Sequence, residues 1–293
     1  MGYLAAFGVV ALLIVGIYCF GYAAKQSSIL YVLLLETIIG LVLIFPLLLF
    51  ADKLSVAEIF NKPHADNWLW LGSAAVFGFL GGNYFSLLNI KTAGEKINSL
   101  LSPAITAVTI VLSFFIFKDR LTVVQWCGAF TTIGVVVWFL LKQKNNGPAN
   151  YNSVGMLSGL CAILCISVTV ICTIKGANAT VSFLQVIWLR LLVALVFILP
   201  LFFFNKSLAK PAQQNYKFYL LVLLGVVCQT ILAGYLWLYA SFHIGISVFQ
   251  VILATLPLWL YITDVYLLKK STPSISFLLC AFFAGLGICF VLL

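Results

Sequence analysis

Long apolar runs alternate with short polar gaps along almost the whole sequence. A helix needs about 20 mostly apolar residues to cross the hydrocarbon core of a membrane. About ten runs reach that length: residues 3–22, 29–50, 68–90, 96–117, 122–141, 153–174, 181–204, 216–241, 246–268 and 273–293. They lack the alternating pattern of barrel strands. The pattern therefore predicts an all-α integral membrane protein with about ten transmembrane helices. We expect the first run to be retained as a helix, because no basic leader of a signal peptide precedes it.

Composition supports a membrane setting and removes other classes of protein. Of 293 residues, 64% are hydrophobic and 8% are charged, whereas a soluble domain carries about 25% charged residues. The net charge of +9 comes partly from lysines in the gaps, such as Lys142 and Lys269, where cations anchor helix ends at lipid headgroups. We therefore expect membrane lipid, and no nucleic acid, as a partner. The eight cysteines and two histidines form no metal-ligand pattern, so no metal ion or cofactor is expected.

The two halves of the sequence resemble each other. The run ETIIGLVLIFPLLLF, which begins at Glu36, aligns at a spacing of 154 with RLLVALVFILPLFFF, which begins at Arg190. A spacing of 151 relates Gly94 to Gly245. The polar stretch KQKNNGPANYN separates the halves, so we predict two five-helix repeats, residues 1–145 and 150–293. Because a repeat of five spans crosses the membrane an odd number of times, the second repeat must be inverted, as is typical of secondary transporters.

One segment carries a family resemblance. Residues 93–137 have a small residue at a helix start, a proline about nine residues later, an acidic turn continuing into Leu-Thr, and a Gly-rich closing helix. These places are filled by Pro103, Asp119, Leu121, Thr122, Gly128 and Gly134. The segment resembles the EamA-type module of the drug/metabolite transporter superfamily, and as two such modules the resemblance covers the whole chain. The second module departs further: Lys270 stands in its turn, and Pro257 lies three positions off the register of Pro103.

The resemblance implies a carrier that moves a small metabolite by alternating access, often outward, across the bacterial cytoplasmic membrane, with both chain ends inside. An amino-acid-like solute is the favoured substrate, and a sugar or another small solute is the alternative. The distribution of Lys and Arg among the gaps favours the opposite orientation under the positive-inside rule. A membrane-embedded enzyme or a channel is the alternative from another class. The chain lacks paired carboxylates, a His cluster and rings of charge, so we expect no enzymatic activity.

Glu36 and Arg190 are the strongest candidates for substrate binding. Each is an ionisable residue inside an apolar run, which costs about 2.5–3.5 kcal/mol on insertion scales and usually marks a functional site. The resemblance adds that the second helix of such modules often bears an arginine, which Arg190 matches and Glu36 does not. We predict that Arg190 holds a substrate carboxylate, and that Glu36 holds an ammonium group or a coupling proton. A buried ion pair, or snorkelling to the interface, is the structural alternative.

Uncharged polar and aromatic side chains form a second group of candidates. Amides and phenols supply the few oriented hydrogen bonds of a ligand pocket, and they also join helices to one another. The candidates are Tyr84, Asn98, Trp188, Tyr235, Tyr239 and Gln250, with Asn83, Asn89, Gln229, Trp237 and His243 near them in sequence or at related positions. In the stretch from Lys91 to Asn98, Gly94 should begin a helix whose unpaired N–H groups favour an anion. A solvated loop explains the same residues.

Small residues and prolines bear on packing and movement. The pairs Gly78/Gly82 and Gly155/Gly159 have the spacing that lets helices approach closely. We expect this packing within one chain, and hence a monomer, with a homodimer as the alternative. Four prolines are predicted within helices, where each is either a hinge or a static bend: Pro46, Pro103, Pro200 and Pro257.

Overall fold

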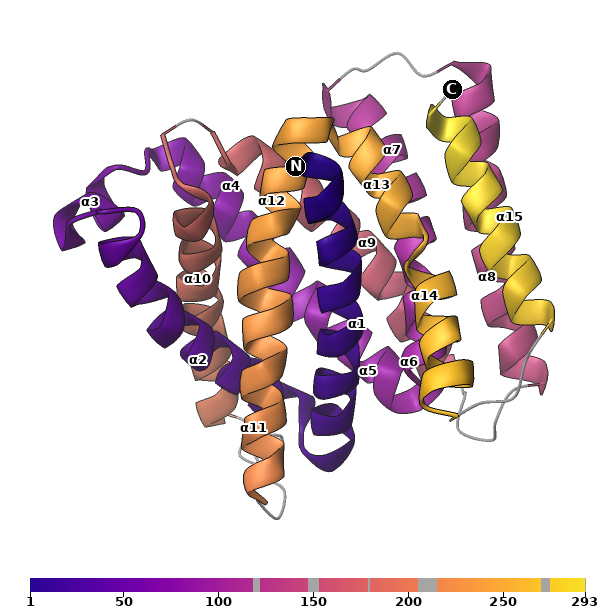
Figure 1. Ribbon diagram of the computed structural model, residues 1–293, viewed down its shortest axis with the longest axis horizontal. Coiled ribbons are helices and arrows are strands. Elements are labelled where there is room, and N and C mark those ends of the chain that lie inside the picture. The colour runs from indigo at the N-terminus through magenta and orange to yellow at the C-terminus, as the bar shows by residue number, and fades with distance from the viewer. Residues whose placement is uncertain (118–121, 147–152, 179, 205–214, 270–274, 293) are drawn as a thin grey trace.

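The protein is a bundle of helices (Figure 1), seen in a computed structural model that describes residues 1–117, 122–146, 153–178, 180–204, 215–269 and 275–292. These ranges contain no strand. The helices, with three π-helical segments labelled η, are α1 (Gly2–Gln26), α2 (Ile29–Phe50), α3 (Val56–Asn61), α4 (Ala65–Ala75), η1 (Val76–Asn83), α5 (Tyr84–Ala93), α6 (Glu95–Ser99), α7 (Leu101–Phe117), α8 (Val123–Asn146), α9 (Ser153–Gly176), α10 (Phe183–Phe204), α11 (Tyr216–Gly225), η2 (Val226–Ala233), α12 (Gly234–Ile244), α13 (Ile246–Ala254), α14 (Leu256–Ile262), η3 (Thr263–Leu267) and α15 (Ile275–Leu292). The predicted turn residues Asp119, Leu121 and Lys270 lie outside the described ranges.

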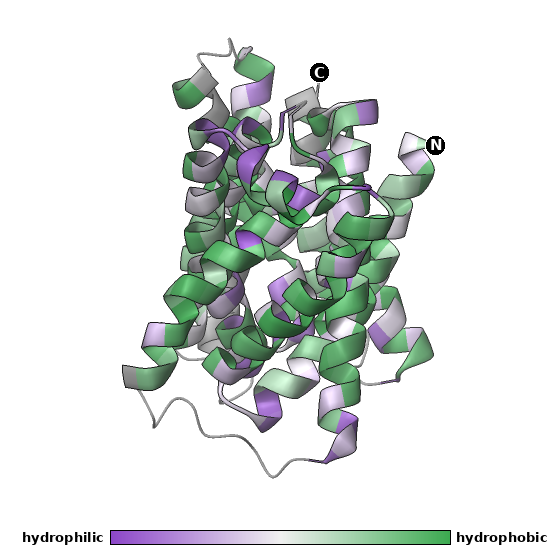
Figure 2. Cartoon of the chain, turned by 90° about the vertical axis from the view of Figure 1, so that its left-hand side faces the viewer, coloured by the Kyte–Doolittle hydropathy of each residue, from purple (hydrophilic) through white to green (hydrophobic). Residues whose placement is uncertain are grey.

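Seven helical stretches are long and apolar enough to cross a membrane. They are Gly2–Gln26, Ile29–Phe50, Ala65–Ala93, Val154–Gly176, Phe183–Phe203, Tyr216–Ile244 and Val248–Leu267. Three further stretches, Ile97–Leu112, Val123–Trp138 and Phe277–Gly287, are apolar but shorter over the described residues. Each predicted run coincides with one of these stretches. Figure 2 shows hydrophobic residues along most of the helices and hydrophilic residues gathered toward their ends, as a multi-pass membrane protein requires.

Helices α2 and α10, which are equivalent in the two halves, lie side by side and run in opposite directions. At one end, Ser182, just before α10, donates a hydrogen bond to Asp52, just after α2. At the other end, the ring of Tyr31 near the start of α2 lies 6.4 Å from that of Phe202 near the end of α10. The first residues of one helix therefore meet the last residues of its equivalent.

Two more pairs of equivalent spans, the fourth and the fifth of each half, repeat this antiparallel arrangement. Between α7 and α13, the Ser102 hydroxyl donates to the Leu253 carbonyl at 3.2 Å, and the Thr106 hydroxyl donates to Oε1 of Gln250 at 3.0 Å. Contacts between α8 and α15 run in the same sense. The Thr132 hydroxyl donates to the Ala284 carbonyl, and Cys280 Sγ donates to the Val135 carbonyl. In all three pairs the residue number rises along one helix as it falls along the other.

The first helix of each half packs against the third span of the other half. Helix α1 contacts α11, η2 and α12, and its equivalent α9 contacts α4, η1 and α5. Figure 1 shows α1 beside α12 in the centre of the view, α8 beside α15 on the right, and both chain ends at the same end of the bundle. The two halves are therefore interlocked rather than laid side by side as separate bodies.

The third span of each half contains a π-helical segment where the sequence predicted a regular helix. The segments η1 and η2 begin at Val76 and Val226, 150 residues apart. Each span then ends at a glycine with positive φ, 93° at Gly94 and 80° at Gly245, a backbone conformation that glycine adopts without strain. Helix α6 begins directly after Gly94, which confirms the predicted helix start there. π-Helical turns occur frequently at functional sites.

Two runs that were predicted as continuous helices are each divided by one residue. The break between α6 and α7 lies at Leu100, and that between α13 and α14 lies at Thr255. Each break falls shortly before a proline, Pro103 or Pro257, because a residue without an N–H fits the first turn of a helix better than its interior. The prolines of α2 and α10 remain inside their helices as predicted.

Glycines set the closest helix contacts. A Cβ on Gly78 would lie 2.9 Å from Thr169 of α9, and one on Gly82 would lie 2.6 Å from Ile166 of the same helix. A Cβ on Gly40 of α2 would lie 2.8 Å from Leu191 of α10. The predicted close approach within one chain is confirmed for Gly78 and Gly82, and Gly40 lets the two equivalent helices cross near the middle of the bundle.

Helix α3 lies at the edge of the bundle, between α2 and α4 in the chain (Figure 1). Its first turn is a capping box in which the hydroxyl and main-chain N–H of Ser55 both donate to Oε2 of Glu58, at 2.6 and 2.7 Å. These two donors lower the pKa of Glu58 below its ordinary value. Gln185 Nε2, in α10, donates to the Ile59 carbonyl at 3.0 Å, so the segment between α2 and α4 is fastened to the start of α10.

A polar cavity between the two halves

Three adjoining cavities lie in the middle of the bundle, along one face of α1. We call them the Arg190 cavity, of about 180 Å³, the Asn98 cavity, of about 250 Å³, and the small cavity between them, of about 30 Å³. Asn83 at the end of η1 and Gln229 within η2 line all three. The π-helical segments of both halves therefore meet at these cavities.

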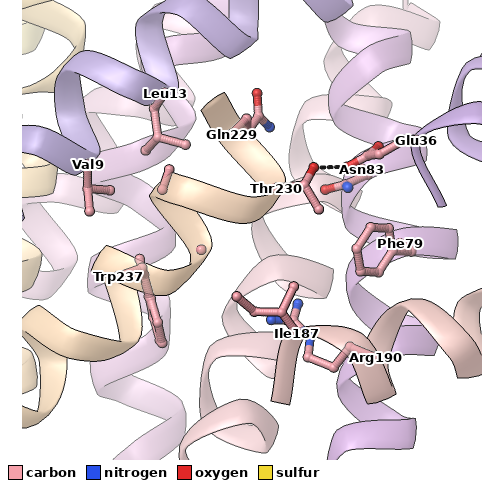
Figure 3. Close-up of a pocket in the computed structure, with 12 residues that line it drawn as sticks. Val9, Leu13, Glu36, Phe79, Asn83, Ile187, Arg190, Gln229, Thr230 and Trp237 are labelled. Carbon is pink, nitrogen blue, oxygen red and sulfur yellow. Dashed lines mark hydrogen bonds between the residues drawn. The ribbon is translucent and has the colours of Figure 1, made fainter. Parts of the chain in front are cut away.

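The Arg190 cavity contains the two ionisable residues that the sequence singled out. Figure 3 shows Glu36 and Arg190 on its wall with Phe79 between them in this view. Its lining is Val9, Leu13, Glu36, Phe79, Asn83, Ile187, Arg190, Gln229, Thr230, Ala233, Gly234 and Trp237. A volume below the 300–1,000 Å³ of drug-sized pockets suits a small solute.

Glu36 is held by a partner from the other half of the chain. Its side chain is 3% exposed, and Oε1 accepts a hydrogen bond of 2.8 Å from the Thr230 hydroxyl in η2. The one ion pair within 4.0 Å among the described residues joins Lys25 to Glu95, so Glu36 and Arg190 share a cavity without forming a direct salt bridge. One carboxylate oxygen of Glu36 thus has a protein donor, and the carboxylate can also accept from a solute in the cavity.

Arg190 has no hydrogen-bond or ion-pair partner among the residues that the structure describes. Its Nε is fully buried and unpaired, and its guanidinium carbon lies 5.8 Å from the ring centre of Phe79. One terminal nitrogen lies 3.2 Å from where a Cβ on Gly78 would stand, so this glycine makes room for the guanidinium. A guanidinium presents a fork of donors that matches a carboxylate, and this half-buried side chain, whose Nε has no acceptor in the described chain, lines the cavity beside Phe79.

Gln229, which also lines the cavity, has an unpaired acceptor beside α1. Its Oε1 is buried without a hydrogen-bond partner in the described part of the chain. A Cβ on Gly16 would lie 2.3 Å from that oxygen, so the absence of a side chain on α1 creates the space that Gln229 occupies. An amide oxygen accepts from an ammonium or a hydroxyl group. Together with Glu36 and Arg190 it gives the cavity acceptors and donors on different elements.

The Asn98 cavity brings together two more of the predicted residues, one from each half. Asn98 and Gln250 both line it. Asn98 Oδ1 accepts from the Ser86 hydroxyl at 3.0 Å, and Gln250 Oε1 accepts from the Thr106 hydroxyl at 3.0 Å. Both amides therefore serve as interhelical links, and each retains an NH₂ group that can face the cavity.

The remaining predicted side chains lie elsewhere. Tyr84 lines a separate lateral cavity. Trp188 is buried against Phe45 and Phe60, with ring centres 6.2 and 5.5 Å away. Tyr235 stands against Phe183 at 5.8 Å, and Tyr239 stacks on His243 at 3.9 Å. These four residues line none of the three central cavities, whereas Trp237, also noted in the sequence, lines two of them.

Two residues in buried polar contacts between helices were missed by the sequence reasoning. Asp264 is 6% exposed in η3 and accepts a hydrogen bond of 2.6 Å from the Tyr18 hydroxyl of α1. It is an acid inside an apolar run, so the signal that found Glu36 was present for Asp264 as well. Thr230, the donor to Glu36, carries no comparable signal, because a threonine inside an apolar helix usually bonds to its own backbone.

Helix α1 is tied to its neighbours at one end of the bundle. Tyr18 and Lys25 are seven residues apart and share a face of α1. Lys25 Nζ lies 2.7 Å from Glu95 Oε1 at the start of α6, and Tyr18 reaches Asp264 of η3. These two contacts hold α1, α6 and η3 together where α1 ends.

An all-helical membrane bundle with a polar cavity between its two interlocked halves is the architecture expected of a membrane transporter, and the family match identifies it as one. The chain belongs to the EamA-like transporter family, whose model matches residues 1–141 and 153–293. It is therefore a transporter of the drug/metabolite transporter superfamily, and the two matched segments correspond to the two halves of the sequence.

The solved structures agree on the fold. A crystal structure of a protein with 16% sequence identity matches with a TM-score of 0.69, covering 99% of this chain and 96% of that chain. At this identity the likeness shows the fold alone. No curated protein sequence matches the chain.

Proposed function

We propose that the protein is a secondary carrier that moves a small amino-acid-like solute, as an exporter, across the bacterial cytoplasmic membrane by alternating access. The observation that carries this proposal is the Arg190 guanidinium, which lies in a central cavity without a protein acceptor among the described residues. A solute carboxylate would supply that acceptor. Lipid and the solute are the proposed partners of a monomeric carrier, and no nucleic acid is expected.

The proposed architecture is ten membrane crossings in two inverted five-helix repeats, residues 1–145 and 150–293. Three pairs of equivalent spans are antiparallel, as inversion requires. Both chain ends lie at the same end of the bundle (Figure 1), which an even number of crossings produces. The three shorter apolar stretches would then cross the membrane as well, each completed by neighbouring residues.

In the proposed binding mode, the two ends of a zwitterion face different walls. Arg190 would hold the carboxylate through charge-assisted hydrogen bonds. Glu36 would hold the ammonium group or exchange a coupling proton, with Gln229 Oε1 as a second acceptor. The support for this assignment is that acceptors and donor line one cavity without neutralising each other.

Alternating access would require α1 to separate from its neighbours at one end. The contacts from Lys25 to Glu95 and from Tyr18 to Asp264 would close that end. At the spacing of 151, the equivalent of Glu95 is Ile246, so the other repeat cannot form the same ion pair. The two ends would therefore close through different chemistry.

The test is counterflow in proteoliposomes that contain the purified protein. Labelled amino acids should exchange with unlabelled ones, and analogues that lack either the carboxylate or the amino group should fail to compete. Arg190→Ala should slow exchange by at least about tenfold, while Lys62→Ala, which alters an exposed cation beside α3, should retain the wild-type rate. Exchange that is equally fast with Arg190→Ala would overturn the site.

A sugar or another neutral small solute is the second candidate. It is favoured by the amide and hydroxyl groups around the Asn98 cavity, Ser86, Asn98, Ser102 and Gln250, which suit the hydroxyls of a neutral ligand. Competition by neutral polyols but not by amino acids in the same counterflow assay would support this alternative.

A further inference from the structure

A fourth cavity lies apart from the three central ones, between α2 and the span formed by η1 and α5. It has a volume of about 580 Å³ and shares no lining residue with the central cavities. Leu80, Tyr84 and Leu88, spaced four residues apart, lie on one face of η1 and α5 and form one wall. Leu33 of α2 stands on the other wall, and Leu201 of α10 contributes from a third helix. We call this cavity the lateral groove.

One end of the lateral groove is polar and positively charged. Ser28, Lys91 and Thr92 line it there. Lys91 is exposed, and its ammonium group donates to the Ser27 carbonyl at 3.5 Å, beside the first turn of the 22-residue helix α2. The hydroxyl of Ser27 is buried and has no partner in the described chain. A lysine and a helix N-terminus together favour an anion at this point.

The length of the groove matches one leaflet of a bilayer. Leu80 and Lys91 are eleven residues apart, which corresponds to roughly 16 Å along a helix at 1.5 Å per residue. The hydrocarbon core of a bilayer is about 30 Å thick, so the apolar wall spans about half of it. The lysine then lies at headgroup level and Leu80 near the middle of the membrane.

We propose that the lateral groove binds one anionic phospholipid from the surrounding bilayer. An acyl chain would lie along Leu80, Tyr84 and Leu88, and the anionic headgroup would contact Lys91, Ser28 and the start of α2. This reassigns Tyr84 from solute binding to lipid binding. The site does not depend on the proposed solute, because the central cavities use the other face of α5, including Ser86 and Ile90.

The positive charge of Lys91 and the length of the groove favour an anionic phospholipid over other occupants. A helix of a second copy is about 10 Å wide with its side chains. It would have to supply an acidic side chain of its own for Lys91, because the described residues that line the groove include none. A zwitterionic phospholipid offers the same chain but a headgroup without net charge. A juxtamembrane cation is worth about 1 kcal/mol toward an anionic lipid, so discrimination of about fivefold is expected.

The experiment is lipid binding to the delipidated full chain in detergent, measured by native mass spectrometry with phosphatidylglycerol and phosphatidylcholine. One phosphatidylglycerol should bind about fivefold more tightly than phosphatidylcholine. Lys91→Gln should remove this preference, whereas Lys217→Gln, which alters another exposed lysine at the start of α11, should preserve it. Leu88→Trp, which fills the groove, should weaken the binding of both lipids.

Three outcomes would overturn the proposal. Equal binding of the two lipids to the wild-type chain would remove the charge selection. Equal losses from Lys91→Gln and Lys217→Gln would indicate a general attraction to basic residues at the surface. Release of the bound lipid by a transported amino acid would place the solute in the groove instead.

Discussion

Glu36 and Arg190 occupy equivalent positions in the two halves, yet their surroundings differ in one respect. Glu36 receives a hydrogen bond from Thr230 across the repeat boundary. Arg190 has a buried Nε and no hydrogen-bonding partner within the described residues. A charged group inside a membrane is costly unless it is paired. The difference is that one charge has a protein donor while the other lacks a protein acceptor in the described chain, and it is the basis of the proposal that Arg190 binds the solute carboxylate.

The crossing of α2 and α10 explains how both charges reach one cavity. The helices are antiparallel and approach closely at Gly40, opposite Leu191. Glu36 lies one turn before Gly40, and Arg190 is adjacent to Leu191. The equivalent positions are therefore brought together from opposite directions. Because one half carries glutamate and the other arginine at this position, the cavity has an acidic and a basic side chain on its lining.

Arg190→Ala should have the largest effect on transport. Losing hydrogen bonds to a charged group costs about 1.5–3 kcal/mol, so solute exchange should fall by roughly 10-fold to 150-fold. Thermal stability should not fall in parallel, because Arg190 Nε has no hydrogen-bonding partner to lose among the described residues. The melting temperature of the purified variant checks this. A large drop in stability with little change in transport would show that Arg190 is structural.

Glu36→Gln should have a smaller and more specific effect. The amide oxygen can still accept from Thr230, so the main loss is the negative charge facing the cavity. Exchange of a zwitterion should fall about fivefold, and any stimulation by an imposed pH gradient should disappear. Transport assays with and without the gradient measure both. If the variant responds to the pH gradient as the wild-type protein does, Glu36 is not the residue that couples transport to protons.

Thr230→Val tests the hydrogen bond that the protein supplies to Glu36. A hydrogen bond between membrane helices contributes about 0.6 kcal/mol on average, so the free energy of unfolding should fall by about that amount and transport by less than about threefold. Thr37→Val is the matched control, because among the described residues that buried hydroxyl bonds to the Leu33 carbonyl of its own helix and to no other helix. Equal effects of the two variants would mean that Thr230 does not specifically support Glu36.

The helical runs, the repeat spacing and the Glu36 and Arg190 positions could all be predicted from the sequence, because each leaves a local mark. Length and hydropathy mark a span, and an ionisable group inside such a span is conspicuous. Asp264 also lies inside an apolar run. The structure adds that it is buried and accepts a hydrogen bond from Tyr18.

Other features depend on tertiary contacts and leave no local mark. The π-helical segments keep the apolar composition of an ordinary helix, so periodicity could not distinguish them. Trp188 looked available for stacking, but its neighbours Phe45 and Phe60 come from segments more than one hundred residues earlier. Similarly, nothing in the sequence pairs Lys25 with Glu95, seventy residues apart.

The Lys25–Glu95 ion pair is expected to affect the balance between the open and closed ends of the carrier rather than the binding of the solute. A partly exposed salt bridge contributes about 0.2–1 kcal/mol, so Glu95→Gln should shift the balance between open and closed ends by no more than about fivefold. A cysteine placed at Ser86, in a background with the native cysteines replaced, should react faster with an impermeant thiol reagent from the Lys25 end of the bundle. The charge exchange Lys25→Glu with Glu95→Lys should restore the slower reaction. If Glu95→Gln leaves the labelling rate unchanged, this end is held by Tyr18 and Asp264 alone, and the asymmetry between the two ends rests on a neutral donor rather than on a pair of charges.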